Sequence, residues 1–312
     1  MPVKIHDGLP AVDILAQENV FVMTDKRAAM QDIRPLKILV LNLMPTKEAT
    51  EAQLLRVLSN SPLQIEVTFL QTATYQPTHI DPLHLNIFYN TFDEVRDKNW
   101  DGLIITGAPV EHLAFTEVEY WDELTSILDW AQKNVYSTLH ICWAAQAGLF
   151  HYYGIDKRTL SSKVFGIFQH SVTDDKNKLT RGFDDVFNAP HSRHTTVLYQ
   201  DIIDCEDLEL LAYSDEAGAY LVASKDGRKV FVTGHAEYDG DTLKKEYERD
   251  KISGLDIDVP HNYFPYDDTT LKPQVTWRAH ANILFSNWVN YCVYQETPYD
   301  LDELDARKQI SE

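Results

Sequence analysis

The sequence contains few cysteines and no long apolar segment. Three cysteines occur among 312 residues, too few and too widely spaced for a disulfide framework, so we expect a reducing compartment, the cytoplasm. The first residues lack the features of a secretory signal, and no run of about 18 uncharged apolar residues predicts a membrane segment. Positive charge is also scarce, since 28 Lys and Arg oppose 48 Asp and Glu for a net charge of −20. This balance argues against nucleic acid as a partner.

The first half of the sequence alternates between two hydrophobic patterns. Apolar runs at residues 37–43, 65–70, 103–107 and 137–141 are typical of buried parallel strands. Helical periodicity at residues 46–60, 117–132 and 144–153 alternates with them. This order predicts an α/β fold with a mostly parallel central sheet and helices on both faces.

The second half is less regular and completes the predicted domain. We expect strands at residues 210–213, 219–224 and 230–233, helices at 241–250 and 277–294, and a loop at 254–273. Residues 1–35 are expected to form an irregular N-terminal arm with one helix near residues 11–18. Residues 36–296 are then a single α/β domain, and residues 297–312 an acidic tail.

Cys142 lies where a buried strand is predicted to turn into a helix. Such a turn lifts a thiol clear of the sheet, and the amides and dipole of the following helix favour its thiolate. The backbone N–H of Trp143 is then a candidate oxyanion donor, and the turn at residues 107–110 is expected to supply a second. The alternative is that Cys142 is a small buried apolar side chain, which is common for free cysteines.

A second motif favours catalysis. Residues 230–237 (Val-Phe-Val-Thr-Gly-His-Ala-Glu) read as an apolar strand that runs into His-x-Glu. Side chains two residues apart in an extended chain point the same way, so His235 can face Cys142 while Glu237 binds the other ring nitrogen. The pattern therefore predicts a triad of Cys142, His235 and Glu237.

These motifs carry a family resemblance. The cysteine turn and the terminal His-x-Glu resemble the class I glutamine amidotransferase fold, which is flavodoxin-like, but the Gly-x-Cys-x-Gly of its glutaminases is missing. The fuller resemblance is to the homoserine O-acyltransferases. It rests on residues 41–47 (Leu-Asn-Leu-Met-Pro-Thr-Lys), 141–146 (Ile-Cys-Trp-Ala-Ala-Gln), 190–193 (Pro-His-Ser-Arg) and 234–239 (Gly-His-Ala-Glu-Tyr-Asp).

The resemblance implies an activity and roles for further residues. It implies transfer of an acyl group from a coenzyme A thioester to the hydroxyl of L-homoserine, through an acyl-thioester on Cys142, at the first committed step of methionine biosynthesis. Lys163, Ser192 and Arg249 match substrate-binding positions of the family. Lys47 matches a lysine suggested to assist the site electrostatically. The resemblance also implies a homodimer, and no permanently bound cofactor beside the co-substrate acetyl-CoA.

Glu111 matches the position that sorts acyl donors in this family. Members with Gly there accept succinyl-CoA, and members with Glu prefer acetyl-CoA. A carboxylate at this position repels the free carboxylate of a succinyl group, so acetyl-CoA is the implied donor. Transfer from succinyl-CoA is the alternative, followed by a Cys-His-Glu hydrolase or glutamine amidotransferase of the same fold, and by a binding module without catalysis.

Two further histidines are candidates for a metal site. His191 and His194 are three residues apart, but no cysteine or carboxylate set in the sequence completes a site around them. We therefore expect both to be loop residues near the mouth of the pocket and expect no bound metal. The sequence also lacks the glycine-rich motifs that bind dinucleotides or nucleoside triphosphates.

Overall fold

The computed structural model describes residues 3–6, 8–17, 23–24, 34–75, 80–298 and 301 of the chain. Its strands are β1 (Val3–Ile5), β2 (Met23–Thr24), β3 (Leu36–Leu41), β4 (Ile65–Leu70), β5 (Tyr89–Asn90), β6 (Trp100–Ile105), β7 (Val135–Ile141), β8 (Arg158–Val172), β9 (Val186–Thr196), β10 (Leu208–Ser214), β11 (Gly218–Ser224) and β12 (Lys229–Val232). Within these residues, twelve strands form one sheet in the order β2-β1-β4-β3-β6-β7-β12-β11-β10-β8-β9, with β5 paired to β4.

The sheet has a parallel and an antiparallel part. Every pairing from β2 to β12 is parallel, and every pairing from β12 to β9 is antiparallel. The carboxyl ends of β3, β4, β6, β7 and β12 therefore lie at one edge, where ligands of open α/β sheets collect. The predicted α/β fold with a mostly parallel central sheet is confirmed.

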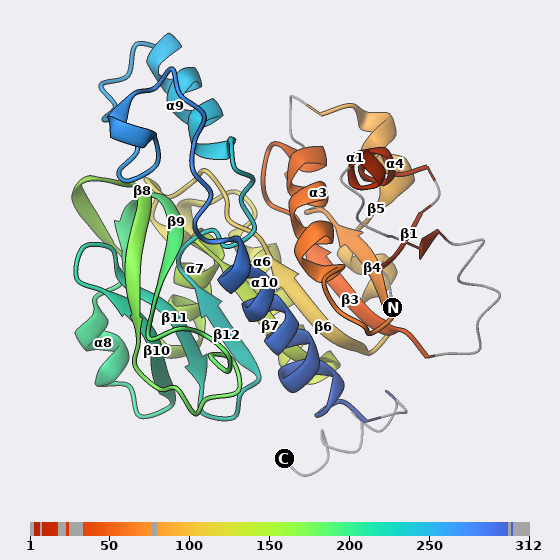
Figure 1. Ribbon diagram of the computed structural model, residues 1–312. Helices are drawn as coiled ribbons and strands as arrows, with labels where there is room; N and C mark the ends of the chain where they lie inside the picture. The colour runs from red at the N-terminus through yellow and green to blue at the C-terminus, as the bar shows by residue number, and fades with distance from the viewer. Residues whose placement is uncertain are drawn as a thin grey trace.

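Helices cover both faces of this sheet. They are α1 (Ala11–Gln17), α3 (Lys47–Leu58), α4 (Pro82–Phe88), α5 (Phe92–Val95), α6 (Trp121–Asn134), α7 (Trp143–Tyr153), α8 (Tyr199–Ile203), α9 (Thr242–Ile252) and α10 (Arg278–Asn287), with short turns η1 (Phe115–Glu117), η2 (Pro265–Asp267) and a π-helix η3 (Trp288–Tyr294). In β3, Ile38 and Val40 belong to the core beneath α3 and α10, whereas Leu39 and Leu41 belong to the core beneath α6. Figure 1 shows α10 in front of the sheet and α6 and α7 behind it.

Several regions differ from the sequence-based expectations, among them α4, β5, α5 and α8, where no element is predicted. The N-terminal segment is not wholly irregular, because β1 and β2 extend the sheet in parallel beside β4. No element is predicted between residues 155 and 196, yet β8 and β9 form a long antiparallel pair. The helix expected at residues 277–294 is α-helical only to Asn287 and continues as the π-helix η3.

The ends of the chain leave two expectations untested. Of residues 297–312, the expected acidic tail, only residues 297, 298 and 301 are described. The single domain over residues 36–296 stays a prediction, although one sheet runs through this range. No described helix combines the length and apolarity that crossing a lipid bilayer requires.

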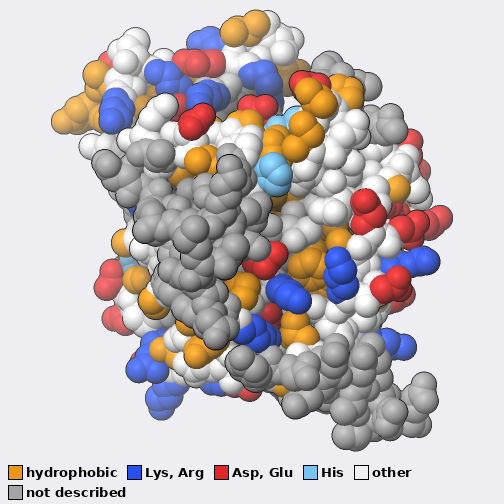
Figure 2. Space-filling view, turned by 90° about the vertical axis from the view of Figure 1, so that its right-hand side faces the viewer, with side chains coloured by type: hydrophobic (Ala, Val, Ile, Leu, Met, Phe, Trp, Pro, Cys, Tyr) orange, Lys and Arg blue, Asp and Glu red, His pale blue; other side chains and the backbone are white. Residues whose placement is uncertain are grey.

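The surface carries both signs of charge. On the face seen in Figure 2, Lys and Arg side chains are interspersed with Asp and Glu. The net charge of −20 is therefore not gathered into one acidic patch on this visible face.

Candidate active site

Cys142 occupies a strained turn between β7 and α7. Its backbone has φ 52° and ψ −112°, a combination that residues other than glycine rarely adopt. The Cys142 amide continues the sheet by donating to the Val232 carbonyl at 2.7 Å, while its own carbonyl accepts from the Ala145 amide at 3.0 Å in the first turn of α7. Strand and helix thus hold the cysteine from both sides, as the sequence predicts for a nucleophile at this turn.

Two backbone segments flank the thiol as candidate oxyanion donors. Trp143 is the first residue of α7, so its N–H is one of those for which the helix supplies no carbonyl. Gly107, at the end of β6, packs so closely that a Cβ built on it would lie 3.3 Å from the Cys142 Cβ. Both segments named from the sequence are therefore adjacent to Cys142.

His235 and Glu237 converge on the same point. The His235 ring and Cys142 pack against the same point, since a Cβ built on Gly107 would lie 3.3 Å from the Cys142 Cβ and 3.5 Å from the His235 Cε1. The His235 Nδ1 lies 2.8 Å from the Glu237 Oε1. All three side chains are buried. Burial alone lowers the pKa of His235, but the charges and hydrogen bonds of Cys142 and Glu237 outweigh it and raise this pKa well above its ordinary value. The arrangement favours a protonated imidazole beside Cys142.

The local conformation behind this geometry differs from the prediction. β12 ends at Val232, and the Tyr238 amide donates to the His235 carbonyl at 3.3 Å, which closes a turn around Glu237. The i, i+2 alternation of an extended strand is therefore the wrong reason for the contact between His235 and Glu237. The turn also stacks the Tyr238 ring on the imidazole at 4.0 Å between centroids, which fixes the orientation of the ring.

The three predicted substrate-binding residues meet at α9. Lys163 Nζ lies 2.7 Å from Glu246 Oε1, and the Ser192 hydroxyl donates to the same oxygen at 2.6 Å. Arg249 Nη2 lies 2.6 Å from Asp250 Oδ1, and its side chain is 67% exposed. Sequence analysis did not single out Glu246 or Asp250, although their spacing from Arg249 places all three on neighbouring positions of one helix. The cluster offers cations and carboxylates together.

Glu111 is held against β9. Its Oε2 accepts from the His194 amide at 2.7 Å and lies 3.4 Å from the Thr195 hydroxyl. Lys157 Nζ donates to the carbonyls of Glu111 and Leu113 at 2.7 and 2.5 Å, which ties the loop after β6 in place. The carboxylate therefore has a fixed position rather than the freedom of a loop side chain.

A buried network that sequence analysis missed joins this carboxylate to α7, the helix that follows Cys142. The Thr195 hydroxyl donates to Gln146 of α7 at 2.8 Å, and Arg193 Nη1 donates to the Thr195 carbonyl at 2.9 Å. Burial lowers the pKa of Arg193 to about 10, opposed by the negative charges of Cys142 and Glu111. Arg193 is therefore a buried cation close to the thiol. Its only sequence signal was its place in the segment at residues 190–193.

The histidines expected in a loop lie in β9. This expectation is wrong for both, and His191 is fully buried, with its Nε2 3.0 Å from the Nε2 of His170. His194 instead lies beside Glu111 and His112, whose potential ligand atoms all fall within 4.8 Å of one another. The fold thus supplies the carboxylate that the local sequence lacked, and these three residues could hold a divalent cation. The absence of a metal stays a prediction.

Lys47 is buried at the start of α3, in the segment that follows β3. Its ammonium donates to the Asn42 carbonyl, and its Nζ lies 5.5 Å from the centre of the Tyr89 ring. Burial lowers the pKa of Lys47 to about 8, although the nearby Glu51 opposes this shift. Lys47 can therefore change charge within a working pH range.

We predict that this titration appears in the pH profile. Because the pKa of Lys47 is lowered, the folded protein loses this positive charge as the pH rises through about 8. If the charge assists acyl transfer, kcat/KM falls above that pH, and Lys47→Arg removes the fall because a guanidinium stays protonated. Rates from pH 6 to 10 test this. An unchanged alkaline limb in Lys47→Arg contradicts the role.

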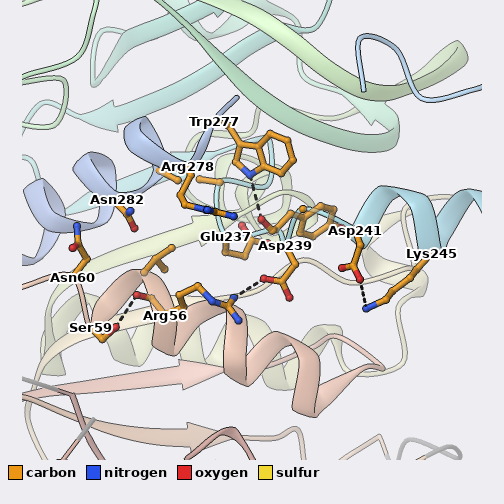
Figure 3. A pocket seen from close by; sticks show the side chains of 15 residues that line it. Arg56, Ser59, Asn60, Glu237, Asp239, Asp241, Lys245, Trp277, Arg278 and Asn282 are labelled. Atoms are coloured by element: carbon orange, nitrogen blue, oxygen red, sulfur yellow. Dashed lines mark hydrogen bonds and ion pairs between the residues drawn. The ribbon is translucent and has the colours of Figure 1, made fainter. Parts of the chain in front are cut away.

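Two cavities open near these residues. One of about 320 Å³ is bounded by the segments that follow β3, β4 and β6, and Lys47 is part of its wall. The other, of about 890 Å³, lies between α3, α10 and the segment that carries Glu237. Figure 3 shows that Arg56 and Lys245 in the larger cavity are already paired with Asp239 and Asp241.

Comparison with solved structures defines the fold class. The chain is similar to a protein of Thermoplasma acidophilum described as a GMP synthase subunit, with TM-score 0.51 and 17% identity over 90% of this chain and 100% of that one. It is also similar to a glutamine amidotransferase of Thermotoga maritima, with TM-score 0.52 and 11% identity over 83% and 98%. The fold is therefore that of the class I glutamine amidotransferase-like proteins, as the sequence indicated.

Sequence comparison is more specific. Residues 2–299 match the family described as homoserine O-succinyltransferase, and this chain belongs to that family. It is 60% identical to a homoserine O-acetyltransferase of Brevibacillus brevis over 97% of this chain and 99% of the relative. It is 56% identical to a homoserine O-acetyltransferase of Petrotoga mobilis over 98% and 99%. The family description and these names share homoserine and differ in the acyl group.

Proposed function

We propose that this protein is an acyltransferase that moves an acetyl group from acetyl-CoA to the hydroxyl of L-homoserine, the first committed step of methionine biosynthesis. The observation that carries the proposal is the convergence of Cys142, His235 and Glu237 at the carboxyl edge of the sheet. Near-full-length relatives named homoserine O-acetyltransferase support the substrate pair.

The first half of the reaction forms an acetyl-enzyme. The Cys142 thiolate attacks the thioester carbonyl, and the amides at Trp143 and the turn after β6 stabilise the oxyanion. When the tetrahedral intermediate collapses, the C–S bond to coenzyme A breaks. The leaving sulfur takes the proton of the His235 imidazolium, which becomes a neutral imidazole.

The second half transfers the acetyl group. Neutral His235 accepts the proton of the homoserine hydroxyl as its oxygen attacks the acetyl-cysteine carbonyl. Collapse of this intermediate releases O-acetylhomoserine and restores the Cys142 thiolate. Glu237 keeps the ring oriented and stabilises the imidazolium in both halves.

The acceptor is a zwitterion, and the cluster at α9 suits one. The largely exposed guanidinium of Arg249 is placed to bind a carboxylate. Glu246, already hydrogen-bonded to Lys163 and Ser192, offers acceptors for an ammonium. We therefore assign the homoserine amino and carboxylate groups to this cluster.

Acetyl-CoA is the proposed donor because of Glu111. Its carboxylate is fixed beside β9, where it repels a succinyl carboxylate but not an acetyl methyl group. Transfer from succinyl-CoA is the second candidate, which the family description favours. We further propose a cytoplasmic homodimer with no permanently bound cofactor. The free state of Cys142, Cys205 and Cys292 agrees with a reducing compartment.

Intact mass spectrometry tests the proposal. Mixing the protein with acetyl-CoA alone is expected to add one acetyl group, mapped by peptide analysis to Cys142, with release of free coenzyme A. Adding homoserine is then expected to remove the label and yield O-acetylhomoserine. Labelling from succinyl-CoA in preference to acetyl-CoA would favour the second candidate, and the absence of any label on Cys142 contradicts both.

A further inference from the structure

The smaller cavity contains no residue of the triad. Its volume is about 320 Å³, and Leu43, Val110, Leu113, Tyr75 and Tyr120 contribute apolar wall. A few polar groups interrupt this wall, notably those of Asn42, Lys47 and Thr72. An apolar pocket with a few placed polar groups is the usual form of a site for a small organic ligand.

This cavity opens close to the nucleophile. Leu41 of β3 pairs with Ile105 of β6, and Ile105 pairs with His140 of β7, two residues before Cys142. Neighbouring strands lie about 4.8 Å apart, so the cavity floor at the end of β3 is roughly 10 Å from the cysteine backbone. The Leu43 amide donates to the Thr106 hydroxyl at 2.8 Å, which joins the cavity wall to the turn that touches Cys142.

The charges around the cavity restrict its occupant. Glu117 and Glu119 line it and are exposed, whereas the ammonium of Lys47 is buried and already donates to the Asn42 carbonyl. A phosphate inside therefore meets two carboxylates against one engaged cation. A neutral, extended group with amides and methyl groups fits the walls better. The acceptor cluster on β8, β9 and α9 lies on the other side of β7 in the strand order, as Figure 1 shows.

We infer that this cavity binds the neutral pantetheine arm of the acyl donor, with the phosphates of the donor held outside it. This assignment rests on the proposed function, since it presupposes a coenzyme A thioester. It makes the donor approach Cys142 over β3 and β6, and the acceptor approach over β9 and α9. Filling the cavity is therefore expected to lower kcat/KM for donors with a long pantetheine arm more than for donors with a short one. The KM for the acceptor is expected to stay unchanged.

The test compares two acetyl donors in variants that each change one residue of the cavity wall. Leu113→Trp narrows the cavity, and Tyr75→Ala removes wall from the segment after β4. For each variant we expect kcat/KM with S-acetylpantetheine to fall about tenfold and that with S-acetyl-N-acetylcysteamine, which lacks most of the arm, to change less than about twofold. The KM for homoserine is expected to stay unchanged.

Leu198→Trp is the matched control, because Leu198 is 44% exposed and Leu113 43%, and Leu198 lies outside the cavity. Equal losses with both donors, which a disturbed Glu111 would cause, overturn the inference, as does no loss with either. Calorimetric binding of free pantetheine separates this inference from the proposed function, because it needs no turnover. Wild-type protein that acetylates Cys142 but binds no pantetheine leaves the proposed function intact and refutes the assignment of the cavity.

Discussion

Cys142→Ala is expected to lower acetyl transfer to homoserine by at least about a thousandfold while the fold is retained. Alanine keeps the apolar Cβ at the turn but cannot form the acetyl-thioester on which both halves of the reaction depend. The rate of O-acetylhomoserine formation measures the loss, and the thermal unfolding midpoint reports on the fold. Activity within about tenfold of wild type excludes a covalent route through this cysteine.

Cys205→Ala and Cys292→Ala are the matched controls for this change. Cys205 is half-buried and Cys292 is buried in η3, and neither lies in the triad. Burial raises the pKa of Cys292 to about 12, so its thiol stays protonated and unreactive. Both variants are expected to keep wild-type turnover and to accept one acetyl group from acetyl-CoA.

Glu111→Gly is expected to raise kcat/KM for succinyl-CoA by up to about a thousandfold, because the repulsion between two carboxylates about 4 Å apart is near 4 kcal/mol at an effective dielectric of 20. Glycine removes both the charge and the volume that face the donor. The fold-decrease in kcat/KM for acetyl-CoA is expected to be smaller than the fold-increase for succinyl-CoA. A competition assay with both donors gives the ratio directly.

Glu111→Gln separates charge from volume at the same position. The amide keeps the size of the side chain but carries no charge, so it relieves only the electrostatic part of the exclusion. An intermediate gain with succinyl-CoA is therefore expected. If neither variant gains succinyl transfer, Glu111 does not select between the donors. Its hydrogen bond to β9 then only holds the loop after β6 in position.

The relative positions of Cys142, His235 and Glu237 could be predicted because each residue has a local signal in the sequence. A buried strand that turns into a helix indicates where Cys142 stands, and His-x-Glu after an apolar strand places His235 and Glu237 at the same edge of a parallel sheet. Parallel pairing of β7 with β12 then brings them together, whatever the conformation of the last few residues. That is why the contact between His235 and Glu237 was predicted correctly although residues 235–237, expected to be extended, form a turn.

The surroundings of the triad had no such signal. Lys163 and Ser192 lie on β8 and β9, where register across the antiparallel pair decides which side chains are neighbours. Glu246 joins them only because α9 packs over these strands, a tertiary contact that residue spacing does not encode. The family resemblance supplied Lys163 and Ser192, and nothing in the chain's own pattern supplied Glu246 or Arg193.

The backbone of Cys142 belongs to two rigid elements at once, since its amide bonds to β12 and its carbonyl to α7. The Cys142 sulfur is therefore anchored independently of the loops that surround it. Arg249 comes from α9, whereas Glu111 and Leu113 come from one loop after β6, so these two segments lie outside β7 and α7 and each can be exchanged without moving the sulfur. A chain built this way can acquire a new donor or acceptor through substitutions in one segment, while the chemistry at the anchored atom stays the same.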